Sequence, residues 1–350
     1  MRITPDILHK IARDTVQQRS HSERDLLAVY LQGSLLTNEP LLGGTADIDL
    51  FFIHNEAVSQ EREIVRLTDD VHLDIAHHPR SLYRQARELR VHPWLGPGIY
   101  GCRVLYDPQH FMDFTQASVR GQFNFPENVI GRVRSQADHA RQMWLALESD
   151  KPASALDTLT LYLRAIRHAA NAIASLSGPP LTERRFLLRF PERARATGHL
   201  GLYNGLIGLL GASNASVETL KSWLPAWKAA FESIPDDSRP ARFHVCRLNY
   251  YMHAFEALVK GDQPQAVLWP LLETWTQLVR LLEDGQRSEK EHLLVEGGPG
   301  VGEHLAAWQA AMDQLSLSGE SSTMRIAALD AYLDGVEEIL ENWAKQAGIE

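Results

Sequence analysis

The first third of the chain contains short apolar runs separated by polar segments. Residues 26–31 are apolar throughout, which is typical of a strand buried on both faces, and a Gly-Ser turn follows them. In residues 47–53 and 71–76, polar side chains stand two positions apart among apolar ones, which predicts strands with one apolar face. The pattern therefore predicts a β-sheet near the start of the chain.

Apolar residues at helical spacing occupy the segments around and after these strands. In the first third they predict helices over residues 5–19, 59–68 and 80–90, with Thr4 or Asp6 as the N-cap of the first helix. The later part of the chain shows helical spacing and no strand pattern, over residues 129–149, 153–176, 217–233, 240–260, 264–284, 301–315 and 322–347. The sequence thus predicts an α+β fold in which a sheet comes first and an all-α region follows.

The predicted sheet and the predicted helical region are separated by Gly121, Asn124 and Pro126, which interrupt the pattern. We therefore expect two domains, one at residues 1–120 that contains the sheet and one at residues 121–350 that forms a helical bundle or array. A chain of 350 residues is long enough for two hydrophobic cores.

Three carboxylates lie within the predicted strands. Asp47 and Asp49 share one face of their strand because side chains repeat every second residue, and Asp74 on another strand would complete the cluster. An ionised carboxylate among apolar strand residues is costly to bury without a partner, and oxygen ligands without cysteine favour Mg²⁺ or Mn²⁺. The sequence therefore predicts that these three residues form a divalent metal site.

The turn at Gly33 and Ser34 is expected to bind phosphate. Glycine lets a phosphate approach the backbone closely, and free backbone N–H groups with the Ser34 hydroxyl are suitable donors to a triphosphate. By itself a Gly-Ser turn is an ordinary loop. Together with the three carboxylates, it indicates a site for nucleotidyl transfer.

These residues resemble the motif of the DNA polymerase β-type nucleotidyltransferase superfamily. In that motif an apolar residue precedes Gly-Ser, and a loop then leads to Asp-x-Asp bounded by apolar residues. The match consists of Gly33, Ser34, Asp47 and Asp49. The chain departs from the motif at Gln32, which stands where an apolar residue is usual, and in a rather long loop.

The resemblance implies a mixed sheet with flanking helices, a pair of metal ions and a third strand carboxylate, for which Asp74 is the matching position. Residues 101–108 look like the last strand of the small bacterial members of the superfamily. In its two-domain size and helical tail, the chain is most similar to aminoglycoside adenylyltransferases.

The resemblance implies a Mg²⁺- or Mn²⁺-dependent nucleotidyltransferase. Such an enzyme moves a nucleoside monophosphate, with ATP as the expected donor, to a hydroxyl of a small acceptor such as a cationic aminoglycoside, and releases pyrophosphate. Asp47 and Asp49 would bridge the two metal ions, and Asp74 would bind one of them.

Charge is distributed unevenly along the chain. Residues 121–200 hold 11 Lys and Arg against 7 Asp and Glu, whereas residues 201–350 hold 11 against 21. On a predicted helix Arg164 shares a face with His168 and Asn171, and we expect Arg164 to contact the nucleotide. The acidic final segment disfavours long nucleic acid as a partner, because gripping phosphates needs a basic surface, and it would attract a cationic acceptor.

Other features bear on location and partners. The two cysteines, Cys102 and Cys246, exclude a disulfide framework, and the sequence shows neither an apolar leader nor an apolar run long enough to span a membrane. We therefore expect a cytoplasmic protein with no membrane segment, and a homodimer is compatible with the sequence. His77 and His78 have no metal-ligand partners at useful spacing, so a surface turn is expected there.

Two other functions stay open. The pairs Arg134 with His139 and Arg247 with His253 resemble the short motif of helical RNases that accompany small nucleotidyltransferases in toxin–antitoxin systems. On that hypothesis the chain acts on RNA or protein. A third hypothesis is a non-catalytic regulator that binds nucleotide and retains the fold.

Overall fold

The structure is a computed structural model that describes residues 3–150, 152–292 and 300–349. The chain divides into two compact units. The first comprises Met1–Gly131 and Pro240–Ala254, and the second comprises Arg132–Arg239 and Phe255–Glu350. The first unit thus continues past the boundary predicted after residue 120, and it includes a short stretch from the region predicted to be the helical domain.

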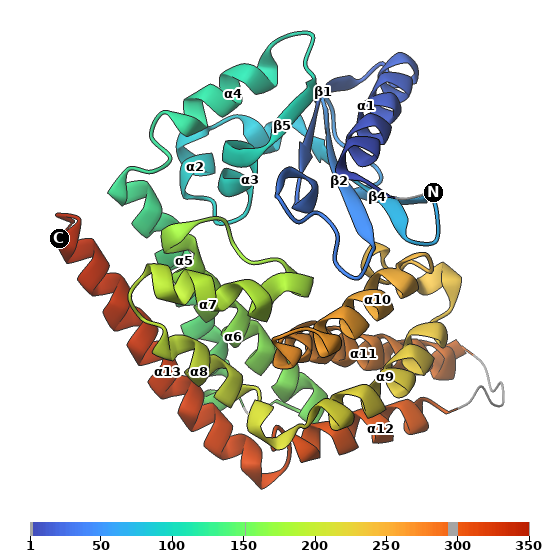
Figure 1. The fold of residues 1–350 in the computed structure, drawn as a ribbon, viewed down its shortest axis with the longest axis vertical. Coiled ribbons are helices and arrows are strands. Elements are labelled where there is room, and N and C mark those ends of the chain that lie inside the picture. Colours follow the sequence, from blue (N-terminus) through green and yellow to red (C-terminus); the bar gives the residue numbers. More distant parts are fainter. Residues whose placement is uncertain (1–2, 151, 293–299, 350) are drawn as a thin grey trace. The chain divides into compact units, whose positions relative to one another are not determined.

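Within the described residues, five strands form one mixed sheet in the first unit (Figure 1). They are β1 (Leu26–Gln32), β2 (Ala46–His54), β3 (Arg62–Arg66), β4 (Val71–Pro79) and β5 (Arg103–Tyr106). Their order across the sheet is β3-β4-β2-β1-β5, in which β2 and β4 are parallel and the other neighbours are antiparallel. The strands predicted at residues 26–31, 47–53, 71–76 and 101–108 are therefore confirmed.

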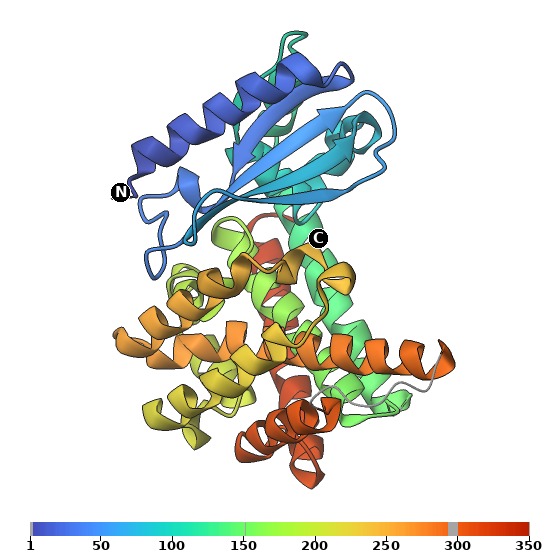
Figure 2. The same cartoon turned by 90° about the vertical axis from the view of Figure 1, so that its right-hand side faces the viewer.

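Helix α1 (Pro5–Ser22) covers one face of the sheet (Figure 2). Three of its apolar side chains, one turn apart, are buried in one apolar cluster with side chains of β1, β2 and β4. These are Leu8, Ala12 and Val16. Thr4 is the N-cap, since its hydroxyl accepts a hydrogen bond at 3.4 Å from a backbone N–H of the first turn.

Three short helices cover the opposite face of the sheet. They are α2 (Ala86–Val91), α3 (Leu95–Gly101) and α4 (Phe111–Arg120). Their buried side chains pack around Tyr30 of β1 and Tyr83, whose hydroxyls are hydrogen-bonded at 3.0 Å. Because both faces are covered, the apolar residues of β1 are buried on either side, as the continuous apolar run predicts.

The helix predicted over residues 59–68 is wrong. This segment contains β3, which pairs antiparallel with β4 and places Glu63 opposite Ile75. Ile64 and Val65 are β-branched and favour a strand. Pairing with β4 also gives hydrogen-bond partners to backbone N–H and C=O groups that an isolated helical turn would leave without one. The helix predicted over residues 80–90 is found only in part, as the 3-10 helix η2 (Arg80–Tyr83) and α2.

No strand follows β5 among the residues that the structure describes. The second unit is built from helices (Figure 1). Its helices, the first of which begins in the first unit, are α5 (Pro126–Ser149), α6 (Ala155–Ser177), α7 (Phe186–Ala196), α8 (Gly201–Leu209), α9 (Val217–Glu232), α11 (Leu268–His292), α12 (Val301–Gln314) and α13 (Glu320–Gln346). The predicted sequence of a sheet followed by helices is confirmed, whereas α7 and α8 were not predicted.

The segment predicted as one helix over residues 240–260 begins instead with a 3-10 helix, η6 (Ala241–Phe243), and continues as α10 (Arg247–Lys260). The first turns of α10 belong to the first unit. No described helix combines the length and the apolar composition that crossing a membrane requires.

Candidate metal centre

The register of the parallel strands brings three carboxylates together. Asp49 of β2 lies opposite Asp74 of β4, and Asp47 lies opposite His72. Because side chains alternate along each strand, all three aspartates project from the same face of the sheet. One carboxylate oxygen from each lies within 4.8 Å of the others. The structure thus gathers the three residues that the sequence proposed as metal ligands.

Gly33 ends β1 directly beside Asp49. Its φ of +88° and ψ of −158° belong to a backbone region that is adopted almost only by glycine. A Cβ atom at this position would lie 1.8 Å from Oδ2 of Asp49. Gly33 is therefore required by its conformation and by the carboxylate that packs against it.

Ser34 stabilises the loop that follows. It is the first residue of the 3-10 helix η1 (Ser34–Leu36), and its hydroxyl donates a hydrogen bond of 3.1 Å to the backbone carbonyl of Pro40. In this arrangement the hydroxyl closes the loop between β1 and β2. The role predicted for Ser34, donation to a phosphate, would require the hydroxyl to change its partner.

Asp74 is held by two arginines. Arg62 of β3 binds it with both arms of its guanidinium, at 2.6 Å from Nε to Oδ1 and 2.5 Å from Nη2 to Oδ2. Arg247, at the start of α10, donates from Nη2 to Oδ2 of Asp74. The side chains of Asp74 and Arg247 are only 2% and 5% exposed, so this pair is shielded from water.

The same turn of α10 reaches Asp47. The Tyr250 hydroxyl donates a hydrogen bond of 2.6 Å to Oδ2 of Asp47, and the Tyr250 ring lies edge-on to the ring of His72 with 5.0 Å between their centroids. Gly43 permits this packing, because a Cβ there would lie 2.1 Å from the backbone oxygen of His253. The start of α10 is thus part of the site.

The carboxylates are only partly neutralised. Burial raises the pKa of Asp49 well above its usual range, and repulsion from Asp47 and Asp74 raises it further, while Arg247 and Arg62 oppose the shift. Among the described residues that act on Asp49, two carboxylates raise its pKa and two guanidinium groups lower it. A divalent cation would favour the ionised form of Asp49.

The residues fit a hard divalent cation in part. Asp47 and Asp49 supply oxygen donors close enough to share one ion. Both oxygens of Asp74 accept hydrogen bonds from arginine. Asp47 and Asp49 are therefore the better ligands, and Asp74 joins them as a ligand only where an arginine changes partner.

Arg164 lies elsewhere in the chain, on α6 in the second unit. It lines a cavity of about 320 Å³ together with Asp157 and Arg280, and Arg280 forms an ion pair of 2.5 Å with Asp157. The contact between Arg164 and a nucleotide stays a prediction.

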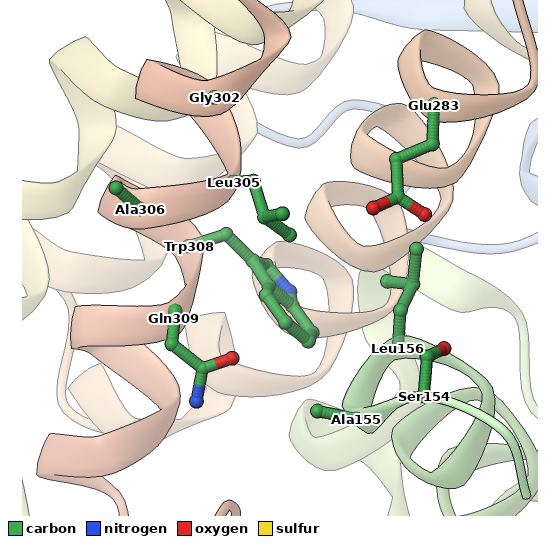
Figure 3. Close-up of a pocket in the computed structure, with 9 residues that line it drawn as sticks. All are labelled: Ser154, Ala155, Leu156, Glu283, Gly302, Leu305, Ala306, Trp308 and Gln309. Carbon is green, nitrogen blue, oxygen red and sulfur yellow. The ribbon is translucent and has the colours of Figure 1, made fainter. Parts of the chain in front are cut away.

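A second cavity in the helical unit has a volume of about 360 Å³ (Figure 3). Its walls include Trp308, Leu305 and Leu156, and Glu283 is the one charged side chain among the described residues that line it. The described part of the lining holds no arginine or lysine that would favour a triphosphate.

Sequence analysis did not identify Arg62, Arg247 and Tyr250 as site residues. Arg62 lies in a segment that the sequence pattern predicts to be helical, and a helix there does not place its side chain beside the aspartates. Arg247 drew attention only for its spacing to His253, and it lies 173 positions from its partner Asp74. No local pattern connects residues so far apart.

Comparison of the sequence with known protein families and with curated proteins finds no match. The geometry of the site therefore carries the functional argument.

Arg247→Met is expected to destabilise the protein by about 3 kcal/mol, at the low end of the cost of breaking a buried ion pair because Arg62 remains on Asp74. Arg66→Met is the matched control. It breaks the pair with Asp69, whose side chains are 63% and 65% exposed, and should cost less than about 1 kcal/mol. Urea denaturation measures both; equal losses would contradict the role of Arg247.

Gly33→Ala is expected to cost about 1–3 kcal/mol through backbone strain and to displace the Asp49 carboxylate, which would weaken Mn²⁺ binding. Gly44→Ala is the control, since Gly44 also has a positive φ but a Cβ there meets nothing within 4 Å. Urea denaturation and an electron paramagnetic resonance titration with Mn²⁺ compare the two. Wild-type Mn²⁺ affinity in a folded Gly33→Ala protein would separate Gly33 from the metal centre.

Proposed function

We propose that the protein is a Mg²⁺- or Mn²⁺-dependent nucleotidyltransferase that uses ATP and modifies a hydroxyl of a small molecule. One observation carries the proposal: the turn at Gly33 packs against Asp49 in a cluster with Asp47 and Asp74. A phosphate can approach the backbone at such a glycine turn, and the neighbouring carboxylates suit a hard cation.

The fold of the first unit supports the proposal. A mixed sheet with helices on both faces agrees with the architecture implied by the resemblance to the DNA polymerase β-type superfamily. The glycine follows the first strand, and the two aspartates lie on the strand paired with it, where Gln32 is opposite Asp49. Gly33 and Asp49 are therefore adjacent in space, although a loop separates them in the sequence.

The proposed reaction is an in-line transfer. The acceptor oxygen forms a bond to the α-phosphorus, the bond from that phosphorus to the pyrophosphate oxygen breaks, and the hydroxyl proton is released. A divalent ion supplies charge neutralisation for the phosphates and lowers the pKa of the acceptor hydroxyl. Asp47 and Asp49 would hold the ion, and backbone N–H groups of the Gly33 turn would contact the triphosphate.

Arg62 and Arg247 have a role in this proposal. Both are fixed cations beside the carboxylates, and phosphate oxygens are strong acceptors for guanidinium groups. An incoming triphosphate would compete with Asp74 for these donors and free one of its oxygens. Arg164 stays a predicted nucleotide contact.

One observation favours a second function. Two arginines neutralise Asp74 without a metal ion. A protein that binds nucleotide without catalysis does not need Asp74 as a metal ligand, so this arrangement is compatible with a non-catalytic regulator. The regulator is therefore retained as the alternative.

Mg²⁺ with ATP is expected to raise the melting temperature of the wild type but not of Asp47→Asn/Asp49→Asn, because ligand binding stabilises only a protein with an intact site. Asp236→Asn/Asp237→Asn, which removes two exposed carboxylates, is the control and should respond like the wild type. Differential scanning fluorimetry reports the shift. The same shift in all three proteins would remove Asp47 and Asp49 from the metal site.

Pyrophosphate release distinguishes the two functions. The enzyme should release pyrophosphate from ATP when a panel of hydroxylated amines is present, whereas the regulator should bind ATP without turnover. Loss of release in Asp47→Asn/Asp49→Asn would assign the activity to this centre.

A cationic acceptor is expected to bind more weakly as salt rises, because residues 201–350 carry 21 acidic against 11 basic side chains and salt screens their attraction. Titration with an aminoglycoside at increasing KCl measures this dependence, and a tRNA titration at low salt is the comparison. Tight tRNA binding without aminoglycoside affinity would favour an enzyme that acts on RNA.

A further inference from the structure

A second cluster of potential metal ligands lies on the other face of the same sheet. His54 ends β2, and His77 lies near the end of β4. Side chains alternate between the two faces of a strand, and each histidine lies an odd number of positions from the aspartates of its own strand. The two imidazoles therefore project from the opposite face, which α1 covers. Glu23, which follows α1, joins them. The surface turn predicted at His77 is therefore wrong, since this residue is part of β4.

The donor atoms of this cluster converge. Nε2 of His54 and Nδ1 of His77 are 2.9 Å apart, and one ligand atom from each of His54, His77 and Glu23 lies within 4.8 Å of the others. A tetrahedral metal with bonds of about 2.0–2.2 Å separates its ligand atoms by roughly 3.4 Å. Small side-chain rotations would bring all three donors to that spacing.

The outward nitrogens of both imidazoles face carboxylates. Nδ1 of His54 lies 3.7 Å from Oδ2 of Asp25, and Nε2 of His77 lies 3.7 Å from Oε2 of Glu63. Metal-bound histidines usually direct their second ring nitrogen to a carboxylate, which fixes the tautomer and the ring orientation. Each histidine of this cluster thus has a carboxylate on that side at ion-pair distance, slightly longer than a hydrogen bond.

The charge of the cluster suits a divalent cation. Glu23, Asp25 and Glu63 carry three negative charges, and Arg19, which contacts Glu23 at 3.3 Å and Glu63 at 2.6 Å, carries one positive charge. With neutral imidazoles, two negative charges remain.

We propose that His54, His77 and Glu23 bind a transition-metal ion, with Zn²⁺ the best match, at a site separate from the aspartate cluster. Two imidazoles and one carboxylate, with a water molecule as the fourth ligand, form a donor set that zinc accepts, whereas Mg²⁺ prefers oxygen donors alone. The ion would cross-link the segment after α1 to β2 and β4. This proposal does not depend on the nucleotidyl-transfer function.

The test is a titration of the full-length, metal-free protein with Zn²⁺ by calorimetry, and with Co²⁺ by visible absorption. We expect one equivalent of Zn²⁺ to bind, and the Co²⁺ complex to show the intense bands of a tetrahedral nitrogen and oxygen site. Zn²⁺ should also raise the melting temperature, because the metal binds only the folded arrangement.

Variants assign the site. His77→Gln and Glu23→Gln should each weaken Zn²⁺ binding by about 100-fold or more, and Asp25→Asn, which removes an outer carboxylate, by roughly 10- to 100-fold. His21→Gln changes an exposed histidine near the cluster in sequence and should bind like the wild type. Asp47→Asn/Asp49→Asn should also keep Zn²⁺ binding, which separates this site from the aspartate cluster.

The outcomes are distinct. Undiminished Zn²⁺ binding in both His77→Gln and Glu23→Gln, each shown by circular dichroism to be folded, would overturn the proposal. Loss of Zn²⁺ binding only in Asp47→Asn/Asp49→Asn would also overturn it. Failure of the wild type to bind Zn²⁺ would overturn it too, and would show that the cluster is a metal-free network of hydrogen bonds and ion pairs.

Discussion

The parallel pairing of β2 with β4 is the constraint on which both candidate sites depend. Its register places Asp49 opposite Asp74 and Phe52 opposite His77. Because side chains alternate along a strand, one register sets the aspartates on one face and the histidines on the other. A slip of one residue between the strands would separate the partners in both clusters and expose apolar side chains that now pack against α1.

The aspartate cluster includes two arginines that partly neutralise its charge. Asp47 and Asp49 stay close enough to share a cation, while Asp74 is held by Arg62 and Arg247. Breaking a buried ion pair leaves an uncompensated charge, so Arg247 stabilises the site whether or not a metal binds. The same guanidinium groups are suited to phosphate, which links the stability of the site to its proposed ligand.

The two clusters differ in donor chemistry as well as in position. Oxygen donors on one face favour Mg²⁺ or Mn²⁺, and imidazole donors on the other favour Zn²⁺. The covered sheet lies between them, with Ile48 and Leu50 of β2 buried on the face of the histidines. A substitution that removes a ligand from one cluster therefore leaves the ligands of the other cluster in place.

Local patterning in the sequence was sufficient for the central strands. Continuous apolar residues in β1 and alternation in β2 and β4 identified these strands and the face that Asp47, Asp49 and Asp74 share. The helical region was also predictable, because apolar residues at helical spacing are a local signal. The segment of β3 was not, since five residues are too few to distinguish a helical from a strand period, and pairing with β4 decided the outcome.

The sequence by itself determined the central strands, helix α1 and the three carboxylates, because periodicity and turn residues act over a few neighbouring positions. Only the tertiary structure decided what those carboxylates contact. Arg247 and Tyr250 reach Asp74 and Asp47 from 173 and 203 positions away. The convergence of Glu23, His54 and His77 likewise needs the strand pairing and the packing of α1, which bring together residues that no sequence spacing connects.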